Sequence, residues 1–138
     1  MEYFKIDGKS YDVIITDLEE NFNILYSENT GRTLAVGAPI VFSPMGTFYG
    51  HKGVVRRKIG LENVFDELYD IVSYPRTVSS ETDGLHFEIA HNQKTISYYG
   101  YVSNGSRALK KIDEKTNKVY WGELQLNIVP IKAQVLPE

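Results

Sequence analysis

The sequence contains no cysteine among its 138 residues. This absence excludes disulfide bonds, thiolate catalysis and cysteine-based zinc sites together, and it suits a protein made in a reducing compartment. No run of about 18 apolar residues occurs, so we expect no segment that spans a membrane. The N-terminal stretch MEYFKIDGKS carries an acidic residue at position 2 and no apolar run, so we expect no signal peptide.

Neither sign of charge dominates the chain. The sequence has 15 Lys and Arg against 18 Asp and Glu, a formal net charge of −3. Binding to phosphate backbones or anionic membranes usually needs clustered positive charge, so we expect neither nucleic acid nor membrane as a partner. Apolar residues make up 42% and charged residues 24%, as in ordinary globular proteins. With no internal repeat or linker-like composition, we expect residues 1–138 to form a single β-rich domain.

Sequence signatures of catalysis are also missing. The stretch SENTGRT resembles the end of a phosphate-binding loop, because a glycine precedes a basic residue and a hydroxyl. Such a loop needs another glycine five positions before Gly31, where this chain has Tyr26, and no helical pattern follows. Gly-x-Ser-x-Gly, His-Glu-x-x-His and calcium-loop motifs do not occur either. We therefore reject the nucleotide-binding interpretation and expect no catalytic residue and no cofactor.

The three histidines do not have the spacing of metal ligands. His86 and His91 are five residues apart on an expected strand, so their side chains point to opposite faces. His51 is distant from both and has no carboxylate or histidine two or four positions away. We expect surface or strand-packing roles for the histidines, and no metal site.

Alternating apolar residues and turn signals predict a mainly β (α+β) fold. Asp7-Gly8 supplies the positive φ of a tight hairpin turn, and Ser103–Ser106 contains Asn-Gly, a strong hairpin signal. The expected strands are residues 3–6, 9–15, 22–26, 40–42, 47–58, 86–91, 95–103, 107–112 and 124–128. We expect a β-sandwich or partly closed barrel of about eight strands, with one helix packed across an opening.

One segment, at about residues 61–74, has helical spacing. Its apolar side is formed by Leu61, Val64, Phe65, Leu68, Ile71 and Val72. Gly60 is the expected N-cap, and Pro75 ends the helix at about Tyr74. We expect Phe65 and Leu68 to be buried against the sheet and Asp66 to lie on the solvated side.

Tyrosine is abundant, with ten residues against six Phe and one Trp. Its ring packs while its hydroxyl stays hydrated, so it suits half-buried strands and protein interfaces. The aromatic group comprises Tyr98, Tyr99, Tyr101, Tyr120 and Trp121. Because Tyr98 and Tyr99 face apart on a strand, a division between core and interface is favoured over a flat sugar-binding platform. The exposed interaction residues are then Tyr99 and Tyr101.

Two further stretches are candidates for contacts with a partner. Residues 27–39 read as a mobile loop or arm, in which Arg32, Leu34 and Val36 have no assigned core face. A basic run contains Arg56 and Arg57, followed by Lys58, and its default interpretation is a solvated edge that discourages mispairing. The alternative is that this run meets the acidic pair Glu19-Glu20 across a contact between two copies.

Four segments carry a resemblance to a known class of protein. They are FKIDGKSYDV, ENFNILYSENTGRTLAVGAPI, FDELYDIVSYPR and VYWGELQLNIVPIKAQ. The chain resembles small tail-associated structural proteins of prophages and long-tailed phages of Gram-positive bacteria. Lys5-Ile6-Asp7-Gly8 matches their short opening strand, and Trp121-Gly122-Glu123 matches the aromatic-Gly-acid step before their terminal strand.

The resemblance implies a non-enzymatic building block. Its partners would be other phage tail proteins and further copies of itself, in a possible homo-oligomeric ring. It would be located in the cytoplasm of the bacterial host before assembly and in the tail of the virion afterwards. The alternative function is a receptor- or carbohydrate-binding accessory module that uses the aromatic residues.

Overall fold

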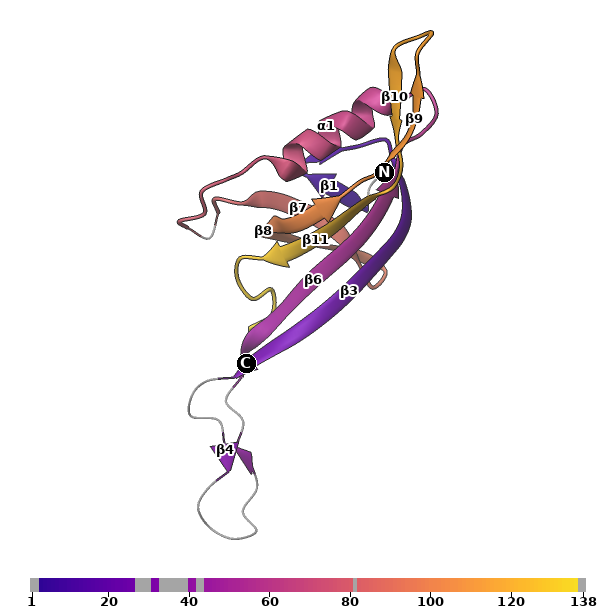
Figure 1. Ribbon diagram of the computed structural model, residues 1–138. Coiled ribbons are helices and arrows are strands. Elements are labelled where there is room, and N and C mark those ends of the chain that lie inside the picture. Colours follow the sequence, from indigo (N-terminus) through magenta and orange to yellow (C-terminus); the bar gives the residue numbers. More distant parts are fainter. Residues whose placement is uncertain (1–2, 27–30, 33–39, 42–43, 81, 137–138) are drawn as a thin grey trace.

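The computed structural model describes residues 3–26, 31–32, 40–41, 44–80 and 82–136 (Figure 1). These residues form a mainly β fold with one helix, which confirms the predicted fold class. The elements are β1 (Phe4–Ile6), β2 (Lys9–Ser10), β3 (Ile14–Tyr26), β4 (Gly31–Arg32), β5 (Ile40–Val41), β6 (Pro44–Arg56), α1 (Glu62–Ser73), β7 (Leu85–His91), β8 (Lys94–Ser106), β9 (Leu109–Asp113), β10 (Lys118–Trp121) and β11 (Leu124–Pro130).

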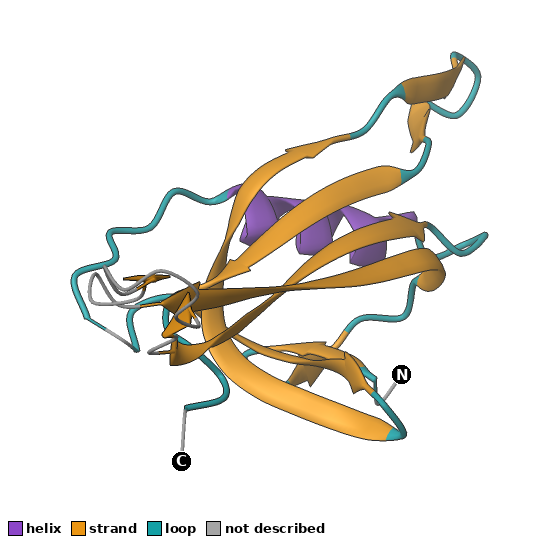
Figure 2. Cartoon of the chain, turned by 90° about the horizontal axis from the view of Figure 1, so that it is seen from below, coloured by secondary structure: helices purple, strands orange, loops and turns teal. Residues whose placement is uncertain are grey.

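Seven of the strands form one antiparallel sheet in the order β2-β1-β7-β8-β11-β6-β3. The sheet is curved, and α1 lies on the inside of the curve (Figures 1 and 2). Two short pairs, β9 with β10 and β4 with β5, form separate two-stranded sheets. The arrangement agrees with the expected β-sandwich-like form, in which a helix covers the inner face of a bent sheet.

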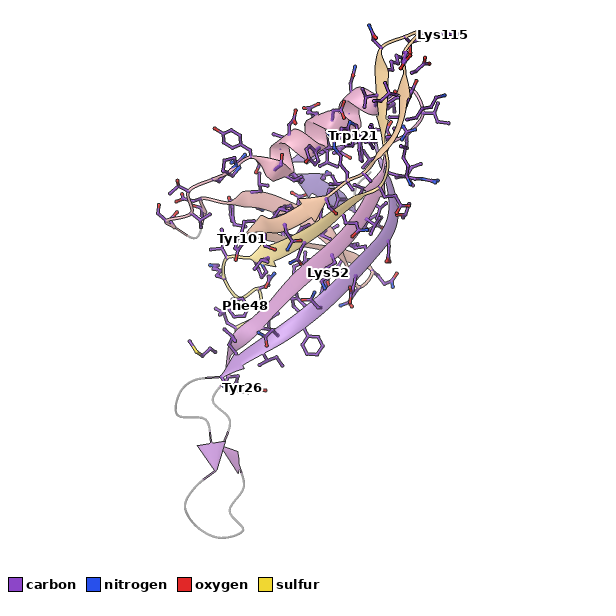
Figure 3. The ribbon with its side chains drawn as sticks, in the orientation of Figure 1. Tyr26, Phe48, Lys52, Tyr101, Lys115 and Trp121 are labelled. Atoms are coloured by element: carbon purple, nitrogen blue, oxygen red, sulfur yellow. The ribbon has the colours of Figure 1, made fainter. Side chains whose placement is uncertain are left out.

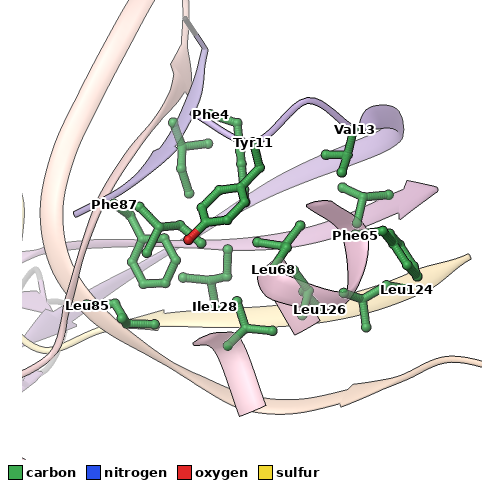
Figure 4. Packing of buried hydrophobic residues seen from close by; sticks show 14 of the residues in the cluster. Phe4, Tyr11, Val13, Phe65, Leu68, Leu85, Phe87, Leu124, Leu126 and Ile128 are labelled. Atoms are coloured by element: carbon green, nitrogen blue, oxygen red, sulfur yellow. The ribbon is translucent and has the colours of Figure 1, made fainter. Parts of the chain in front are cut away.

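The core lies between α1 and the inner face of the sheet (Figure 4). Every second residue of β7 and of β11 is buried, because successive strand side chains point to opposite faces. From the helix, Phe65 and Leu68 are 1% and 0% exposed, which confirms their predicted burial. The helix begins one residue later than expected, with Leu61 as N-cap, while Gly60 takes a positive φ of 83° in the turn before it.

The short hairpin turns follow the sequence closely. Asp7 and Gly8 have φ values of 53° and 79°, as a two-residue turn between β1 and β2 requires. Asn92 has φ 54° in the turn between β7 and β8. The first hairpin was predicted correctly, although its second strand is only the two residues of β2 and the chain then leaves the ladder before β3 begins.

The Asn-Gly turn predicted at Ser103–Ser106 is wrong. Strand β8 continues through it to Ser106 and pairs with β11, with Asn104 opposite Asn127 and Gly105 opposite Leu126. A Cβ at Gly105 would lie 3.0 Å from the carbonyl oxygen of Gln125, so this glycine permits close approach of two strands. Pairing along β11 thus overrides the local turn preference.

Strands β3 and β6 form a long ribbon at one end of the sheet. They pair from Ile14 opposite Arg56 to Tyr26 opposite Pro44, so both are longer than expected. The pair β4–β5, with Arg32 opposite Ile40, continues the same hairpin beyond the end of the ribbon (Figure 1). The described residues 14–26 and 44–56 are therefore the two strands of one long antiparallel ribbon, whose far end projects from the body.

Candidate interaction surface

The distal half of the β3–β6 ribbon exposes large apolar side chains. Phe22 is 68% exposed and Met45 is 58% exposed. Alternation along β3 places Phe22, Ile24 and Tyr26 on one face of the ribbon and Leu25 on the other. Residues 22–26 were predicted as a strand from their alternating apolar residues, and the structure shows that the apolar face of this strand is not part of the core. Figure 3 shows Tyr26 at the far end of the ribbon.

The C-terminal segment lies beside the same part of the ribbon. The Thr47 amide donates to the Val135 carbonyl at 2.8 Å, and the side-chain amide of Gln134 bonds both backbone groups of Tyr49, at 2.9 and 3.0 Å. These bonds occupy the edge of β6 that β11 leaves open. We define the ribbon patch as Phe22, Ile24, Leu25, Tyr26, Met45, Val135 and Leu136, all of which are exposed.

The outer edge of β3 is open. Strand β3 is the last strand of the seven-stranded sheet, and no other described strand pairs with its outer side. Its 13 residues contain no proline, glycine or lysine, the residues that commonly interrupt or protect such edges. The edge does carry acidic side chains and a bulge between Ile15 and Asp17, but beyond them it runs beside exposed apolar side chains, and such a surface is suited to pairing with another chain of complementary charge.

The residues predicted in the arm are only partly described. Arg32 lies in β4 opposite Ile40 of β5. Leu34 and Val36, like most of residues 27–39, lie outside the described residues. Their predicted contacts therefore stay predictions.

The basic run after β6 lines a groove at the other end of the ribbon. Arg56, Arg57, Lys58 and Lys110 surround this groove, whose volume is about 860 Å³. Arg57 donates to the carbonyl oxygen of Trp121, and Lys58 pairs with Asp12. Two of the three basic residues of the run thus already have contacts within the chain. Of this run, Arg56 is the residue left for the predicted contact with Glu19-Glu20 of a second copy.

The aromatic residues are divided among three places. Tyr98 is 7% exposed on the inner face of β8, whereas Tyr99 and Tyr101 are exposed on its outer face, as predicted. Trp121 packs against the guanidinium of Arg107, whose Cζ lies 4.3 Å from its ring centroid. Tyr120 lies under Arg57 at 5.0 Å. These rings form no single platform.

A polar cluster that is buried at His51 and Tyr98 and partly exposed at Glu20 joins four strands, and sequence reasoning missed it. One carboxylate oxygen of Glu20 is 3.0 Å from Nε2 of His51 and 2.8 Å from Nδ1 of His91. The Tyr98 hydroxyl is 2.7 Å from Nδ1 of His51, which is fully buried. Glu20 and His51 are direct cross-strand partners, so only the β3–β6 register reveals the contact. Glu20 is therefore engaged within the chain, and Glu19 is the residue of the Glu19-Glu20 pair without such a contact among the described residues.

The pKa values of the cluster follow from its burial. Burial lowers the pKa of His51, and the nearby Glu20 carboxylate opposes this only in part. Burial acts to raise the pKa of Glu20, but hydrogen bonds from His91 and His51 outweigh it, so that pKa is lowered. Burial also raises the pKa of Tyr98. At neutral pH the cluster thus holds a neutral His51 between a tyrosine and a carboxylate.

The chemistry available to this cluster is limited. Both imidazoles direct a nitrogen at the same carboxylate oxygen, so their polar atoms satisfy one another instead of converging on an ion. No group of three or more potential ligands able to hold a metal is found among the described residues. The cluster ties the edge strand β3 to β6, β7 and β8, and we interpret it as a structural link.

Comparison with protein-family models gives no match, and a search of curated proteins gives none either. Within the described part of the chain, no helix has the length and apolar character needed to cross a bilayer. The functional argument accordingly rests on the ribbon patch and the open edge of β3.

Proposed function

We propose that this protein is a non-enzymatic structural subunit of a phage or prophage tail, which self-associates and docks on other tail components. The ribbon patch is the observation that carries the proposal. Soluble monomers rarely expose contiguous apolar patches of more than a few hundred Å², and larger ones mark interaction sites. Here the exposed apolar residues lie on both faces of a projecting ribbon, so neighbours can cover it from two sides.

The sequence resemblance supplies the biological setting. An assembly that builds a tail needs subunits with extended, self-complementary surfaces rather than a reaction centre. A stable contact buries about 800 Å² per partner, and the ribbon supplies apolar side chains and unpaired backbone groups for such a contact. Burial of apolar area at about 25 cal/mol per Å² provides the driving force.

The test is a double substitution in the ribbon patch, Phe22→Ser with Ile24→Ser. Because both side chains are exposed, the free energy of unfolding should change little, while the association constant should fall at least tenfold in sedimentation velocity. Ile59→Ser is the matched control, since Ile59 is 97% exposed but lies away from the patch. A wild-type protein that stays monomeric at all concentrations and is absent from tail particles would contradict the proposal.

A carbohydrate-binding role is the alternative, and one observation favours it. Tyr99 and Tyr101 are exposed on the same face of β8, and the Tyr99 ring lies 4.8 Å from that of His86. Aromatic faces of this kind stack on sugar rings. Binding of cell-wall glycans in titration calorimetry, abolished by Tyr99→Ala but not by Phe22→Ser, would support this role over assembly.

A further inference from the structure

The open edge of β3 carries exposed acidic side chains. Asp17 and Glu19 lie on its outward face, with Glu20 turned into the buried cluster. Lys52 is the cross-strand partner of Glu19, yet they form no ion pair within 4.0 Å among the contacts of the described residues. This edge therefore presents uncompensated negative charge together with the unpaired backbone of a 13-residue strand.

The β9–β10 hairpin has the opposite character. It projects from the body as a separate two-stranded sheet, with Lys115 at its tip (Figures 1 and 3). Both of its edges are open among the described strands. Its four lysines are exposed and form no ion pair within the described structure; they are Lys110, Lys111, Lys115 and Lys118. Asp113 and Glu114 lie on the same hairpin, with Asp113 as the cross-strand partner of Lys118, so the positive charge of the hairpin is a net excess of four lysines over two acids.

The hairpin also lacks a core of its own. Leu109, Ile112 and Val119 are 47%, 56% and 43% exposed. Two-stranded sheets are at best marginally stable in water unless other strands or a helix cover them. The base of the hairpin is nevertheless well fixed, because the Gly122 amide donates to the Ala108 carbonyl at 2.7 Å and Arg107 lies between the rings of Tyr69 and Trp121. A firmly held base with an uncovered tip suits a docking element.

We infer that the β9–β10 hairpin of one copy pairs with the open edge of β3 in a second copy, and so adds its strands to the neighbour's sheet. This inference rests on the self-association proposed above and names the two surfaces that meet. Backbone hydrogen bonds between the strands supply affinity, while the lysines opposite Asp17 and Glu19 select the partner and the register.

The β3 edge that the hairpin meets belongs to a second copy, because the hairpin cannot reach the β3 edge of its own chain. The hairpin rises from the end of the sheet at which β3 begins and points away from that strand (Figure 1). It cannot fold back on its own β3 edge without breaking the contacts at its base. Since the two surfaces differ, the contact is head-to-tail, and it generates a ring or a filament according to the rotation between copies.

Charge reversal on each surface tests the inference. One variant carries Lys111→Glu with Lys118→Glu, and the other carries Asp17→Lys with Glu19→Lys. Each variant alone places like charges at the contact, so its association constant should fall at least tenfold. In an equimolar mixture the hairpin of each variant meets the β3 edge of the other variant, so opposite charges face each other at every contact. The mixture should therefore associate about as strongly as the wild type, with the two variants alternating.

Because the chain has no cysteine, single introduced cysteines allow a second measurement, which reports the proximity of two residues instead of an association constant. Mixing Lys118→Cys with Glu19→Cys should give a disulfide-linked dimer under mild oxidation, more rapidly than either variant alone. Lys94→Cys mixed with Glu19→Cys is the control, because Lys94 is the first residue of β8, next to the β7–β8 turn and away from the hairpin. Circular dichroism melts verify that each variant folds.

The outcomes separate the inference from the proposed function. A wild-type protein that associates, with charge-reversed variants that associate equally well and no selective crosslink, overturns the pairing and leaves the tail-subunit proposal standing. The pairing is also overturned, and the tail-subunit proposal again stands, if the double variant Phe22→Ser, Ile24→Ser loses association while the charge reversals have no effect. A wild-type protein that never self-associates overturns the pairing, and its absence from tail particles as well overturns the tail-subunit proposal.

Discussion

At the scale of single residues, burial decides which side chains the fold depends on. His51 is the buried polar residue of the described core, and each of its ring nitrogens has a partner. A buried imidazole with satisfied nitrogens costs little, whereas the same ring with a proton added must hold a charge away from water. The cluster around Glu20 therefore makes stability depend on pH.

We predict that the free energy of unfolding falls as the pH is lowered below about 6.5, the ordinary pKa of histidine. The pKa of His51 is lowered in the folded state, so below 6.5 the unfolded chain takes up a proton that the folded chain resists. The lowered pKa of Glu20 adds a loss of the same sign as the pH falls below 4.5. The facing groups are Glu20 on β3, His91 on β7 and Tyr98 on β8.

The measurement is urea denaturation between pH 7.5 and pH 4. His51→Gln should reduce stability at neutral pH and flatten its decline with acid, because the titrating group is gone. His86→Gln is the control, since His86 lies on the outer face away from the cluster. An equal decline in wild type and His51→Gln would show that other groups govern the acid response.

The helix offers a comparison of buried and exposed positions. Leu68→Ala should destabilise the protein by about 2–5 kcal/mol, the usual range for emptying a core site. Asp66 was predicted to lie on the solvated side of the helix. The structure differs, because Asp66 accepts a hydrogen bond from Arg107 at 3.0 Å. Asp66→Ala should cost up to about 1 kcal/mol, as for partly exposed ion pairs. Asp70→Ala, on the exposed side, should change stability by less than about 0.5 kcal/mol in the same denaturant melts.

At the scale of elements, strand spacing set by glycine is a testable feature of the sheet. A Cβ at Gly100 in β8 would lie 2.6 Å from the Val129 carbonyl oxygen of β11, and backbone atoms cannot easily move. Gly100→Ala should therefore destabilise by about 1–3 kcal/mol, as in other overpacked sites. Gly53→Ala in β6 meets only the Leu18 side chain at 3.8 Å and should be neutral or stabilise by about 0.4–1 kcal/mol. Similar thermal melts for the two variants would contradict this view of strand spacing.

The sequence predicts those elements whose structure is determined locally. The helix follows from the spacing of residues such as Phe65 and Leu68, the first hairpin from Asp7-Gly8, and β11 from its strict alternation. The path of β8 through Asn104-Gly105 was not predictable, because it depends on pairing with a strand about twenty residues later. Local preference is only one of the forces on a strand.

The candidate site was predictable in part for the same reason. Exposure of Tyr99 and Tyr101 follows from alternation along one strand. The Glu20–His51–His91 cluster requires the register of β3 on β6 and the curvature that brings β7 toward β3. The exposure of Phe22 was also not predictable. Alternating apolar residues form the same sequence pattern whether the layer that covers them belongs to the same chain or to another.

At the scale of the whole molecule, the fold combines a tightly packed body with two uncovered projections. The body contains α1 and the buried faces of β1, β7, β8 and β11. The projections are the distal β3–β6 ribbon and the β9–β10 hairpin (Figure 1), and most of the side chains of β3 and β9 are exposed. Regions with few buried apolar contacts open at a lower free energy than the core does. Stability in the isolated chain is therefore concentrated in the body, and in the proposed assembly the projections would gain theirs from neighbours.

We predict that amide hydrogen exchange reports this division directly. In dilute protein, amides of β9, β10 and residues 22–26 of β3 should exchange at least tenfold faster than those of β7 and β11, because their hydrogen bonds are shielded by fewer apolar side chains. At concentrations where the protein associates, β9–β10 and β3 should become protected together, since each covers the other in the proposed contact. The charge-reversed hairpin variant should lose both increases in protection at once, and the equimolar mixture with its counterpart should regain them. Protection of only one of the two elements on association would place the contact elsewhere on the molecule.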